Sequence, residues 1–532
     1  MTQTPAAEDT DKRLAHQTSN GGSVPEETRG GLVYLEEFTR VALARPDATA
    51  IASDDRRITY GEMHQSVLQR AEALRLAGLQ PGERVSLIAE NSAAYVITSL
   101  AVWAAQGVLV TIYPSTAPAD LAATIADSDP VLVLCDSVTD SVVRQSTREG
   151  LPVESIDGNF RPTKVASGTK ANPEGLREPL HLVCYSSGTT SRPKAIMISE
   201  SALHNGARTY AEVWGLTSDD VSIICLPMAW LYGLNSTTMA TLLVGGTVVP
   251  LRRAKPEILA HAIEKYKATF FPAVTTIITK LVAFLEESAE QHDLSSLRLI
   301  VSGGEPRNEP AFDRFRKYSG VPVHDTFCAS ECFPLITYDP VRDPEPKHGA
   351  AGRLVPRSRL KVVNEAGNEV AVGEVGEALS QGPGLMLGYW NDPEQTAAAL
   401  TPDGWYRTKD LVRVDEQGYV SVAGRKSDMI IRGGSNISPA EVEQVLKEHP
   451  SVDDVAVVGQ PDPIYGEQVV AVIELANGEA LDADGLRAFA AERLSAYKVP
   501  TVYKAIEQLP SNNTTQKVNR REVKKLLENG TI

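Results

Sequence analysis

Short apolar runs that end in glycine- or proline-bearing loops recur along this chain and constrain its fold more than any other feature. The runs RVSLIAE and PVLVLCD are rich in β-branched residues and alternate with helical patterns between Leu32 and about Gln145. The runs DDVSIICLP, GGTVVPL, ATFFPAV and LRLIVSGGEP repeat this alternation further along. The pattern predicts an α/β fold. Because α/β proteins bind ligands in loops at the ends of such strands, we expect the functional site there.

The pattern changes after about Pro356, where short alternating runs and tight turns replace the α/β repeat. Runs such as GEVGEALSQG and VDEQGYVSVAG predict a small antiparallel sheet or barrel. Further along, Ser438 is expected to cap a helix with Pro439 and Glu441 in its first turn, and two strands and two more helices follow. A chain of 532 residues is too long for one core, so this last part is expected to be an α+β domain behind a hinge.

The charge and the cysteine content restrict the partners of the protein. A formal net charge of -16 argues against a surface for nucleic acid or an anionic membrane. Five cysteines, few and odd in number, are typical of free thiols in a reducing compartment, so we expect a cytoplasmic protein. Residues 1–30 lack an apolar segment and predict a disordered polar tail. The apolar stretch from Ala93 carries polar residues and predicts a buried helix running into a buried strand.

The segment YSSGTTSRPKAIMIS, residues 185–199, carries the most chemical information. Its small residues, adjacent threonines, glycine and lysine favour a turn whose amides and hydroxyls bind phosphate oxygens. The spacing of its glycine and lysine differs from that of a Walker A loop. Taken alone, such a segment is more often a simple connection than a phosphate site.

A series of motifs along nearly the whole chain resembles the adenylate-forming superfamily, which includes acyl-CoA synthetases, nonribosomal adenylation domains and luciferases. Residues 185–199 resemble its phosphate loop. The later motifs, in order, resemble its aromatic pocket motif (LPMAWLYGLNS), adenine loops (SGGEPRNE and DTFCASEC), ribose motif (GWYRTKD), hinge and coenzyme A loop (GRKSDMIIRGGSNISPAEVE) and C-terminal lysine motif (NNTTQKVNRREV). One match is weak, whereas an ordered series is specific. The resemblance implies an acid–thiol ligase that makes an acyl-adenylate and then an acyl-CoA thioester.

The resemblance also implies a mobile C-terminal domain. The expected parts are a disordered tail (1–30), an N-terminal adenylate-binding domain (31–424), a hinge (425–430) and a C-terminal lid domain (431–532). The hinge residue would be Asp428. After adenylation, rotation about it would remove Lys517 from the site and bring in the coenzyme A loop around Gly434.

Carried over position by position, the motifs assign the nucleotide contacts to residues of this chain. Asp410 would accept hydrogen bonds from both ribose hydroxyls, and Arg425 would place a cation beside them. Phe327 would stack on the adenine, and Ser330 would contact the α-phosphate. The nucleotide-binding residues implied in this way are Ser187, Gly188, Thr189, Lys194, Gly303, Gly304, Glu305, Asp325, Thr326, Phe327, Ser330, Asp410 and Arg425.

The resemblance assigns catalysis to Lys517, Glu331 and Thr190. Lys517 would neutralise charge as the carboxylate meets the α-phosphate, and Glu331 would bind Mg²⁺, which prefers hard oxygen ligands. The acyl pocket would comprise Trp230, Tyr232, Gly233, Ala273, Cys328 and Ala329, and coenzyme A would contact Lys426, Arg432, Gly433 and Gly434. The expected cofactors are ATP or AMP, held as the acyl-adenylate, coenzyme A and Mg²⁺. The expected partner is a small carboxylic acid or its adenylate.

His324, Cys328 and Cys332 are spaced four apart and raise the question of a zinc site. Three ligands without a second pair, inside a stretch that the adenine loop already explains, favour another interpretation. Cys328 and Cys332 are expected to be small, semi-buried pocket residues.

Departures from the family pattern bear on the two half-reactions. Ser191 and Ala195 replace glycines expected in the phosphate loop, and Gln516 replaces the glycine before the catalytic lysine. Added side chains restrict backbone angles and close approach to phosphates. Cys328 replaces another glycine and Trp230 a common histidine, which alters the acyl pocket.

The resulting hypothesis is that adenylation is impaired and that the enzyme mainly completes the thioester from a preformed acyl-AMP, with a separate adenylating enzyme as its supplier. Three alternatives stay open. The protein is a complete ATP-dependent two-step acyl-CoA synthetase, an adenylating enzyme that loads a carrier-protein thiol, or a non-catalytic module that binds an acyl-adenylate.

Overall fold

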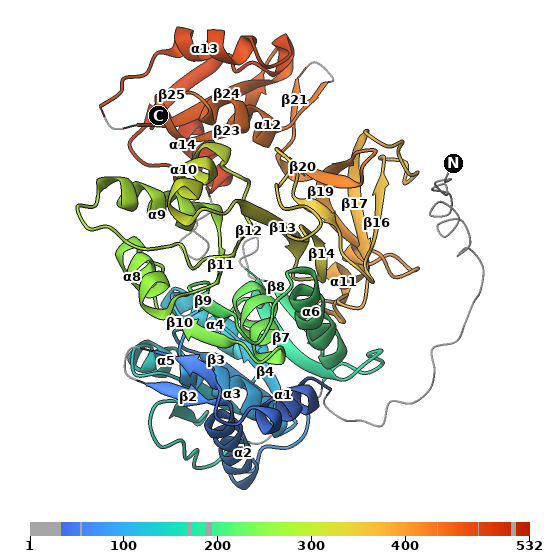
Figure 1. Cartoon of the computed structure of the whole chain (residues 1–532). Helices are drawn as coiled ribbons and strands as arrows, with labels where there is room; N and C mark the ends of the chain where they lie inside the picture. Colours follow the sequence, from blue (N-terminus) through green and yellow to red (C-terminus); the bar gives the residue numbers. More distant parts are fainter. Residues whose placement is uncertain are drawn as a thin grey trace, which may run out of the picture. The chain divides into compact units, whose positions relative to one another are not determined.

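The protein is described from a computed structural model, which covers residues 33–53, 56–166, 172–186, 194–432, 435–476, 478–511 and 518–532. The tail expected at residues 1–30 lies outside these described residues. The described strands form sheets of thirteen, seven and five strands (Figure 1). Parallel strands at the centre of the two larger sheets, packed with helices, confirm the α/β class that the sequence predicts.

The central part of the thirteen-stranded sheet is parallel. Its strands, in spatial order, are β13 (Val323–Ala329), β12 (Leu299–Gly303), β11 (Phe270–Ala273), β9 (Val221–Ile224) and β10 (Thr247–Pro250), followed by β1 (Thr49–Ala52) and β2 (Arg57–Thr59). Apolar side chains from one face of these strands pack against α8 (Pro256–Tyr266), α9 (Thr275–Glu287) and α10 (Glu309–Ser319). After β9 the chain first adds β10 on one side of β9, and it then returns to add β11 on the other side.

The seven-stranded sheet carries the segment that resembles a phosphate loop. Its strands, in spatial order, are β18 (Gly388–Tyr389), β8 (Lys194–Ser199), β7 (Leu180–Ser186), β4 (Val108–Thr111), β3 (Arg84–Ile88), β5 (Leu132–Cys135) and β6 (Val153–Ser155). Helix α3 (Ala93–Ala104) is buried and leads into β4, as the sequence predicts for this stretch. The largest core cluster combines residues of both sheets with α1 (Val33–Ala44), α2 (Tyr60–Leu76), α3 and α6 (Glu200–Val213).

The antiparallel strands expected after Pro356 do form, but they extend the large sheet instead of making a separate sheet or barrel. Those after Pro356 are β16 (Arg359–Val363), β17 (Val375–Gln381), β19 (Tyr406–Val414) and β20 (Tyr419–Arg425), and they join two antiparallel strands that precede Pro356, β14 (Cys332–Thr337) and β15 (Gly352–Leu354). The reason is local. The chain reverses after β13, so that β14 pairs antiparallel with β13 and the sheet continues without a break. These strands keep a small hydrophobic cluster of their own.

The five-stranded sheet confirms the elements predicted near the C-terminus. It contains β21 (Ile430–Arg432), β22 (Ser435–Ile437), β23 (Val452–Asp462), β24 (Gly466–Leu475) and β25 (Val502–Ile506), with α12 (Pro439–Lys447), α13 (Ala483–Ala491) and α14 (Arg520–Glu528) beside them. The side chain of Ser438 accepts a hydrogen bond from the Glu441 amide, which is the predicted cap of α12.

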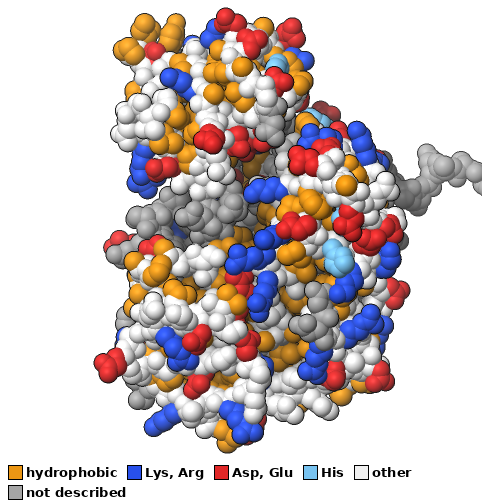
Figure 2. All heavy atoms as spheres, turned by 90° about the vertical axis from the view of Figure 1, so that its left-hand side faces the viewer, with side chains coloured by type: hydrophobic (Ala, Val, Ile, Leu, Met, Phe, Trp, Pro, Cys, Tyr) orange, Lys and Arg blue, Asp and Glu red, His pale blue; other side chains and the backbone are white. Residues whose placement is uncertain are grey.

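The remaining elements are short. They are α4 (Pro118–Ser128), α5 (Asp140–Ser146), η1 (Tyr232–Met239), α7 (Ala240–Leu243), α11 (Pro393–Ala399), η2 (Lys426–Asp428) and η3 (Ala496–Lys498). Within the described ranges, every helix is too short or too polar to traverse a bilayer. On the face in Figure 2, acidic, basic and hydrophobic side chains are intermixed.

A close backbone contact joins the start of β14 to the segment before β18. The Phe333 amide donates to the carbonyl of Gly384 over 3.3 Å, and a Cβ added at Gly384 would lie 1.5 Å from the Phe333 carbonyl oxygen. No L side chain fits at this distance without moving the backbone.

We expect Gly384→Ala to lower the free energy of unfolding by about 3 kcal/mol, because the added methyl group overlaps a carbonyl that cannot move independently. Urea denaturation measures the change. Gly382→Ala is the matched control, since its Cβ would come no closer than 3.1 Å to another atom, the Ser358 hydroxyl. Equal stability of the two variants would contradict the assigned contact.

Candidate functional site

The predicted pocket residues converge at the carboxyl ends of the parallel strands. Trp230 lies in the loop after β9, Ala273 ends β11, Gly303 ends β12 and Thr326 lies late in β13. Because the chain leaves β9 and β11 toward opposite sides, a crevice is expected between these two strand ends. The structure thus brings the expected acyl and adenine residues to one edge of the sheet.

The loop that carries Trp230 is held by a residue far away in the sequence. The buried amide of Asn91 donates to the Leu226 carbonyl and accepts from the Met228 amide, both over 2.8 Å. Beyond this clamp, the Trp230 ring stacks on Tyr113 with centroids 5.2 Å apart and planes at 18°. The paired rings form a flat, apolar wall.

Tyr232 and Gly233 continue the same loop into η1. The Tyr232 hydroxyl donates to the Val301 carbonyl over 3.2 Å, which fixes the ring beside Gly303. A Cβ at Gly233 would lie 2.3 Å from the Pro227 carbonyl oxygen, so glycine is required there for packing. This requirement explains Gly233 without any contact to substrate.

The two cysteines of this region differ in exposure. Cys332 is buried, with 1% of its surface accessible, whereas Cys328 is exposed and accepts a hydrogen bond from the Tyr210 hydroxyl over 3.3 Å. The expectation that both are semi-buried is therefore wrong, because Cys328 lies at the end of β13 where the strand leaves the core. Ala329 follows Cys328 and is half-buried.

The segments expected to hold adenine are tied together by carboxylates. Glu305 accepts from the Thr276 amide over 2.7 Å, and Gly304 has a φ of +79° that favours glycine. Arg307 donates to both carboxylate oxygens of Glu309 and stands 4.0 Å from Asp325. Burial raises the pKa of Asp325 to about 7, and Arg307 opposes that shift.

Phe327 and Ser330, expected at the adenine and the α-phosphate, lie at the end of β13 and in the turn that follows. Both are partly exposed. One side of Phe327 packs against the hydrophobic cluster of the antiparallel strands. Partial exposure leaves both residues accessible to a ligand.

The predicted ribose residues lie opposite each other on β19 and β20. Asp410 pairs with Arg425 in the strand register, and the Arg425 Nε donates to the Asp410 carboxylate over 3.1 Å. The Asp410 side chain is buried, while the Arg425 side chain is 50% exposed. A buried carboxylate with a partly free cation beside it suits a ligand that carries both hydroxyl and phosphate groups.

Glu331 lies buried in the turn between β13 and β14. Its carboxylate oxygen Oε1 accepts from the Tyr389 hydroxyl over 2.8 Å. Lys194, at the start of β8, places its ammonium group 5.2 Å from the centre of the Tyr389 ring. Burial lowers the pKa of Lys194, and the charge of Glu331 opposes that shift. A carboxylate, a phenol and an ammonium from separate segments therefore meet.

Ala195 follows Lys194 but does not belong to a loop. It lies within β8, pairs with Tyr185 and packs into a hydrophobic cluster with 5% of its surface exposed. The expectation that Ala195 lies in a loop around phosphates is therefore wrong, because regular strand pairing already begins at Lys194.

The residues expected near the hinge and coenzyme A form ion pairs and ring contacts. Lys426 pairs with Glu377 over 3.2 Å, and Asp428 lies 3.8 Å from Arg520. Arg432 donates to the Tyr497 carbonyl over 3.0 Å and covers the ring of Tyr465 at 5.2 Å. Tyr465, Tyr497 and Ile464 expose 51%, 43% and 81% of their surfaces. Exposed rings beside a guanidinium group make this surface suited to a nucleotide.

Several predicted residues cannot be placed. Outside the described residues lie Ser187, Gly188, Thr189, Thr190, Gly433, Gly434 and Lys517, together with the departures Ser191 and Gln516. Their assigned roles stay predictions.

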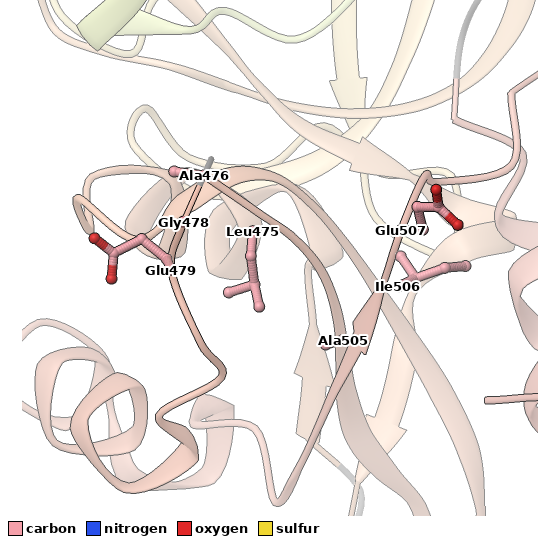
Figure 3. A pocket seen from close by; sticks show the side chains of 7 residues that line it. All are labelled: Leu475, Ala476, Gly478, Glu479, Ala505, Ile506 and Glu507. Carbon is pink, nitrogen blue, oxygen red and sulfur yellow. The ribbon is translucent and has the colours of Figure 1, made fainter.

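A surface hollow of about 380 Å³ is formed by β24, β25 and the residues after β24 (Figure 3). It is lined by Leu475, Ala476, Gly478, Glu479, Ala505, Ile506 and Glu507. Figure 3 shows the carboxylates of Glu479 and Glu507 at opposite sides of it. Because two carboxylates repel phosphate, the hollow does not suit a nucleotide.

Comparison with known proteins identifies the family. Residues 38–390 match the AMP-binding enzyme family, and residues 441–516 match the AMP-binding enzyme C-terminal domain. The chain belongs to the AMP-binding enzyme family. It is an acid–thiol ligase of the acyl-CoA ligase type, for which ATP or AMP and coenzyme A are implied.

The relatives of this AMP-binding enzyme match along nearly its whole length. It is 31% identical to the indoleacetate–CoA ligase of Aromatoleum aromaticum over 93% of this chain and 98% of that protein. ATP-bound MatB from Rhodopseudomonas palustris is 27% identical with a TM-score of 0.81, over 93% of this chain and 99% of that one. The anthranilate CoA ligase AuaEII with anthranoyl-AMP is 25% identical with a TM-score of 0.84, over 93% and 98%.

Some residues at this site of the AMP-binding enzyme were not found by sequence reasoning. Asn91, Tyr113, Arg307 and Tyr389 all contact predicted site residues or their loops. Most lie outside the motifs that carry the resemblance. The run GYW at 388–390 follows a Gly-Pro-Gly turn and was the one local signal of a constrained segment.

The buried carboxyl of Asp325 should make the stability of this AMP-binding enzyme depend on pH. Its folded-state pKa of about 7 is above the ordinary value of 3.8. Its contribution to stability is therefore complete below about pH 4 and is lost as the pH rises through 7. Urea denaturation between pH 4 and 8 should show a fall in wild-type stability, relative to Asp325→Asn, across this window. Parallel stability curves would show that Asp325 is already ionised.

Proposed function

We propose that this protein forms acyl-CoA thioesters from a bulky carboxylic acid through a bound acyl-adenylate, and that adenylation is the weaker half-reaction. The observation that carries the proposal is the junction of Lys194, Glu331 and Tyr389, which joins the start of β8 to the β13–β14 turn. Such a junction is suited to the charge that develops when a carboxylate meets an α-phosphate.

The ribose would bind at Asp410. Its buried carboxylate would accept hydrogen bonds from both ribose hydroxyls, and the half-exposed Arg425 side chain would offer its guanidinium group to phosphate. The adenine would stack on the accessible side of Phe327, between the ends of β12 and β13. This arrangement holds AMP in the same place for both half-reactions.

Glu331 would hold Mg²⁺ together with the phosphates. Among the described residues, no group of three His, Cys, Asp or Glu side chains is placed to bind a metal. A single carboxylate, completed by phosphate oxygens and water, fits Mg²⁺, which usually binds in this way. When bound, the ion would neutralise phosphate charge.

The chemistry proceeds in two steps. In the first, a carboxylate oxygen of the acid attacks the α-phosphorus of ATP and pyrophosphate leaves, with Lys517 neutralising the charge. In the second, the coenzyme A thiolate attacks the acyl carbonyl and AMP leaves as the good leaving group of a mixed anhydride. The hinge at 425–430 would exchange Lys517 for the coenzyme A loop between the steps.

The acyl group would lie against the Trp230 and Tyr113 rings. Two stacked rings at 5.2 Å offer a flat apolar surface, which favours a planar or bulky apolar acid. The names of relatives support this class, since one is an indoleacetate–CoA ligase and another holds anthranoyl-AMP. The exposed Cys328 would border the same pocket.

Coenzyme A would bind at the exposed surface around Arg432. The guanidinium group provides charge for phosphate, and the rings of Tyr465 and Tyr497 provide stacking surfaces. Lys426 is already paired with Glu377, so Arg432 is the better phosphate ligand of the two.

The weaker adenylation rests on Ser191 and Gln516. Both replace glycines of the family pattern, where added side chains hinder close approach to phosphates or limit the delivery of Lys517. Ala195 gives no support, because its methyl group packs into the core. The loss of a few charge-assisted hydrogen bonds, at about 1.5 to 3 kcal/mol each, would slow adenylation by several decades.

Two assays on the purified protein test the proposal. We expect thioester from synthetic aromatic acyl-AMP plus coenzyme A, and much slower pyrophosphate exchange with the acid plus ATP. Equal rates would identify a complete two-step synthetase. Pyrophosphate exchange without thioester formation would favour a carrier-protein acceptor. No detectable reaction in either assay, across a range of acids, would favour a non-catalytic binding module.

Restoring glycine tests where the limitation lies. The double variant Ser191→Gly with Gln516→Gly should raise the rate of pyrophosphate exchange by about tenfold or more, because it restores close backbone approach to the phosphates. The rate with preformed acyl-AMP should stay unchanged. Ala195→Gly is the matched control and should not accelerate either step, since it acts on the core. No gain in the double variant would contradict the proposed limitation.

A further inference from the structure

Tyr389 joins the two large sheets at the candidate site. It lies on β18, which pairs antiparallel with β8 and places Tyr389 opposite Ile196. Its backbone amide donates to the Thr396 hydroxyl over 2.8 Å, and only 4% of its surface is exposed. Both ends of the residue are therefore fixed, and the ring has little freedom to turn.

The same segment holds Glu331 at two points. The Met386 amide donates to the Glu331 carbonyl over 2.8 Å, and the Tyr389 hydroxyl donates to the Glu331 Oε1 over 2.8 Å. The backbone of Glu331 is thus held by Met386 and its side chain by Tyr389, three positions further along the chain. The side-chain bond is charge-assisted and buried, and bonds of this kind are the stronger ones.

Tyr389 also lies beside two other segments of the candidate site. Its ring lies under the Lys194 ammonium group, which is 5.2 Å from the ring centre. Tyr406, on β19, lies near the Tyr389 hydroxyl. Tyr406 precedes the predicted ribose residue Asp410 on that strand. Tyr389 therefore lies beside both the start of β8 and the predicted ribose strand.

We propose that Tyr389 is a positioning residue, which holds the Glu331 carboxylate in the orientation that receives the metal-bound phosphates of ATP. The inference rests on the proposed function, because Glu331 has this task only in an adenylate-forming site. Tyr389 itself makes no contact with the reacting atoms and acts through Glu331.

Equilibrium binding of ATP by calorimetry tests the inference, because binding is read without turnover. In Tyr389→Phe, which keeps the ring under Lys194, the affinity for ATP in excess Mg²⁺ should fall by about tenfold, the effect of one charge-assisted hydrogen bond. Affinity measured in EDTA should change by less than about twofold. A merely structural role would lower both affinities together.

Two further variants isolate the effect. Tyr419→Phe is the matched control, because the Tyr419 hydroxyl donates to the Asp343 carboxylate over 2.7 Å away from this junction. It should lower the unfolding temperature without changing Mg²⁺-dependent binding. In a Glu331→Gln background, Tyr389→Phe should give no further loss, because the residue acts through Glu331.

The inference is overturned if Tyr389→Phe leaves Mg²⁺-dependent binding unchanged, if the losses add fully in the double variant, or if the wild type shows no Mg²⁺-dependent binding of ATP. Failure of the proposed function has a separate sign, which is the absence of thioester from acyl-AMP and coenzyme A. Should Tyr389→Phe not fold, Tyr389→His, which keeps a ring with a hydrogen-bond donor, tests the same contact with Glu331. It should weaken Mg²⁺-dependent binding less than Glu331→Gln does.

Discussion

The contact between residues 331–333 and residues 384–389 is the constraint on which the site depends. The Phe333 and Gly384 backbones approach so closely that a Cβ has no room, and two hydrogen bonds from Met386 and Tyr389 hold Glu331. This contact joins the thirteen-stranded sheet to the seven-stranded sheet. Without it, the carboxylate of one sheet and the ammonium of Lys194 on the other would not share a site.

Once the sheets are joined, the ends of their strands determine which side chains lie at the candidate site. After β9 and β11 the chain turns to opposite sides, which is where a crevice is expected, and the Trp230 loop is fixed at these strand ends by Asn91. The antiparallel strands add the buried carboxylate of Asp410. In the proposed function, an apolar acyl group and a polar nucleotide would therefore bind at one edge of the thirteen-stranded sheet.

The sequence predicted local features well and distant ones poorly. The cap at Ser438 and the buried helix from Ala93 were confirmed, because both depend on residues within a few positions. Ala195 was expected in a loop and lies in a strand, since pairing with Tyr185 across the sheet decided its state. The burial of Cys328 was also wrong, because the end of β13 leaves the core.

By itself, the sequence determined the element types, the order of the motifs and the family, because periodicity, caps and motif spacing are properties of neighbouring residues. Only the tertiary structure decided which side chains meet. Tyr389 and Glu331 are 58 positions apart, and the sequence between them gives no sign of their hydrogen bond. Such pairs are set by how whole sheets pack, since the gain from one contact is smaller than the entropy of closing the loop between its residues.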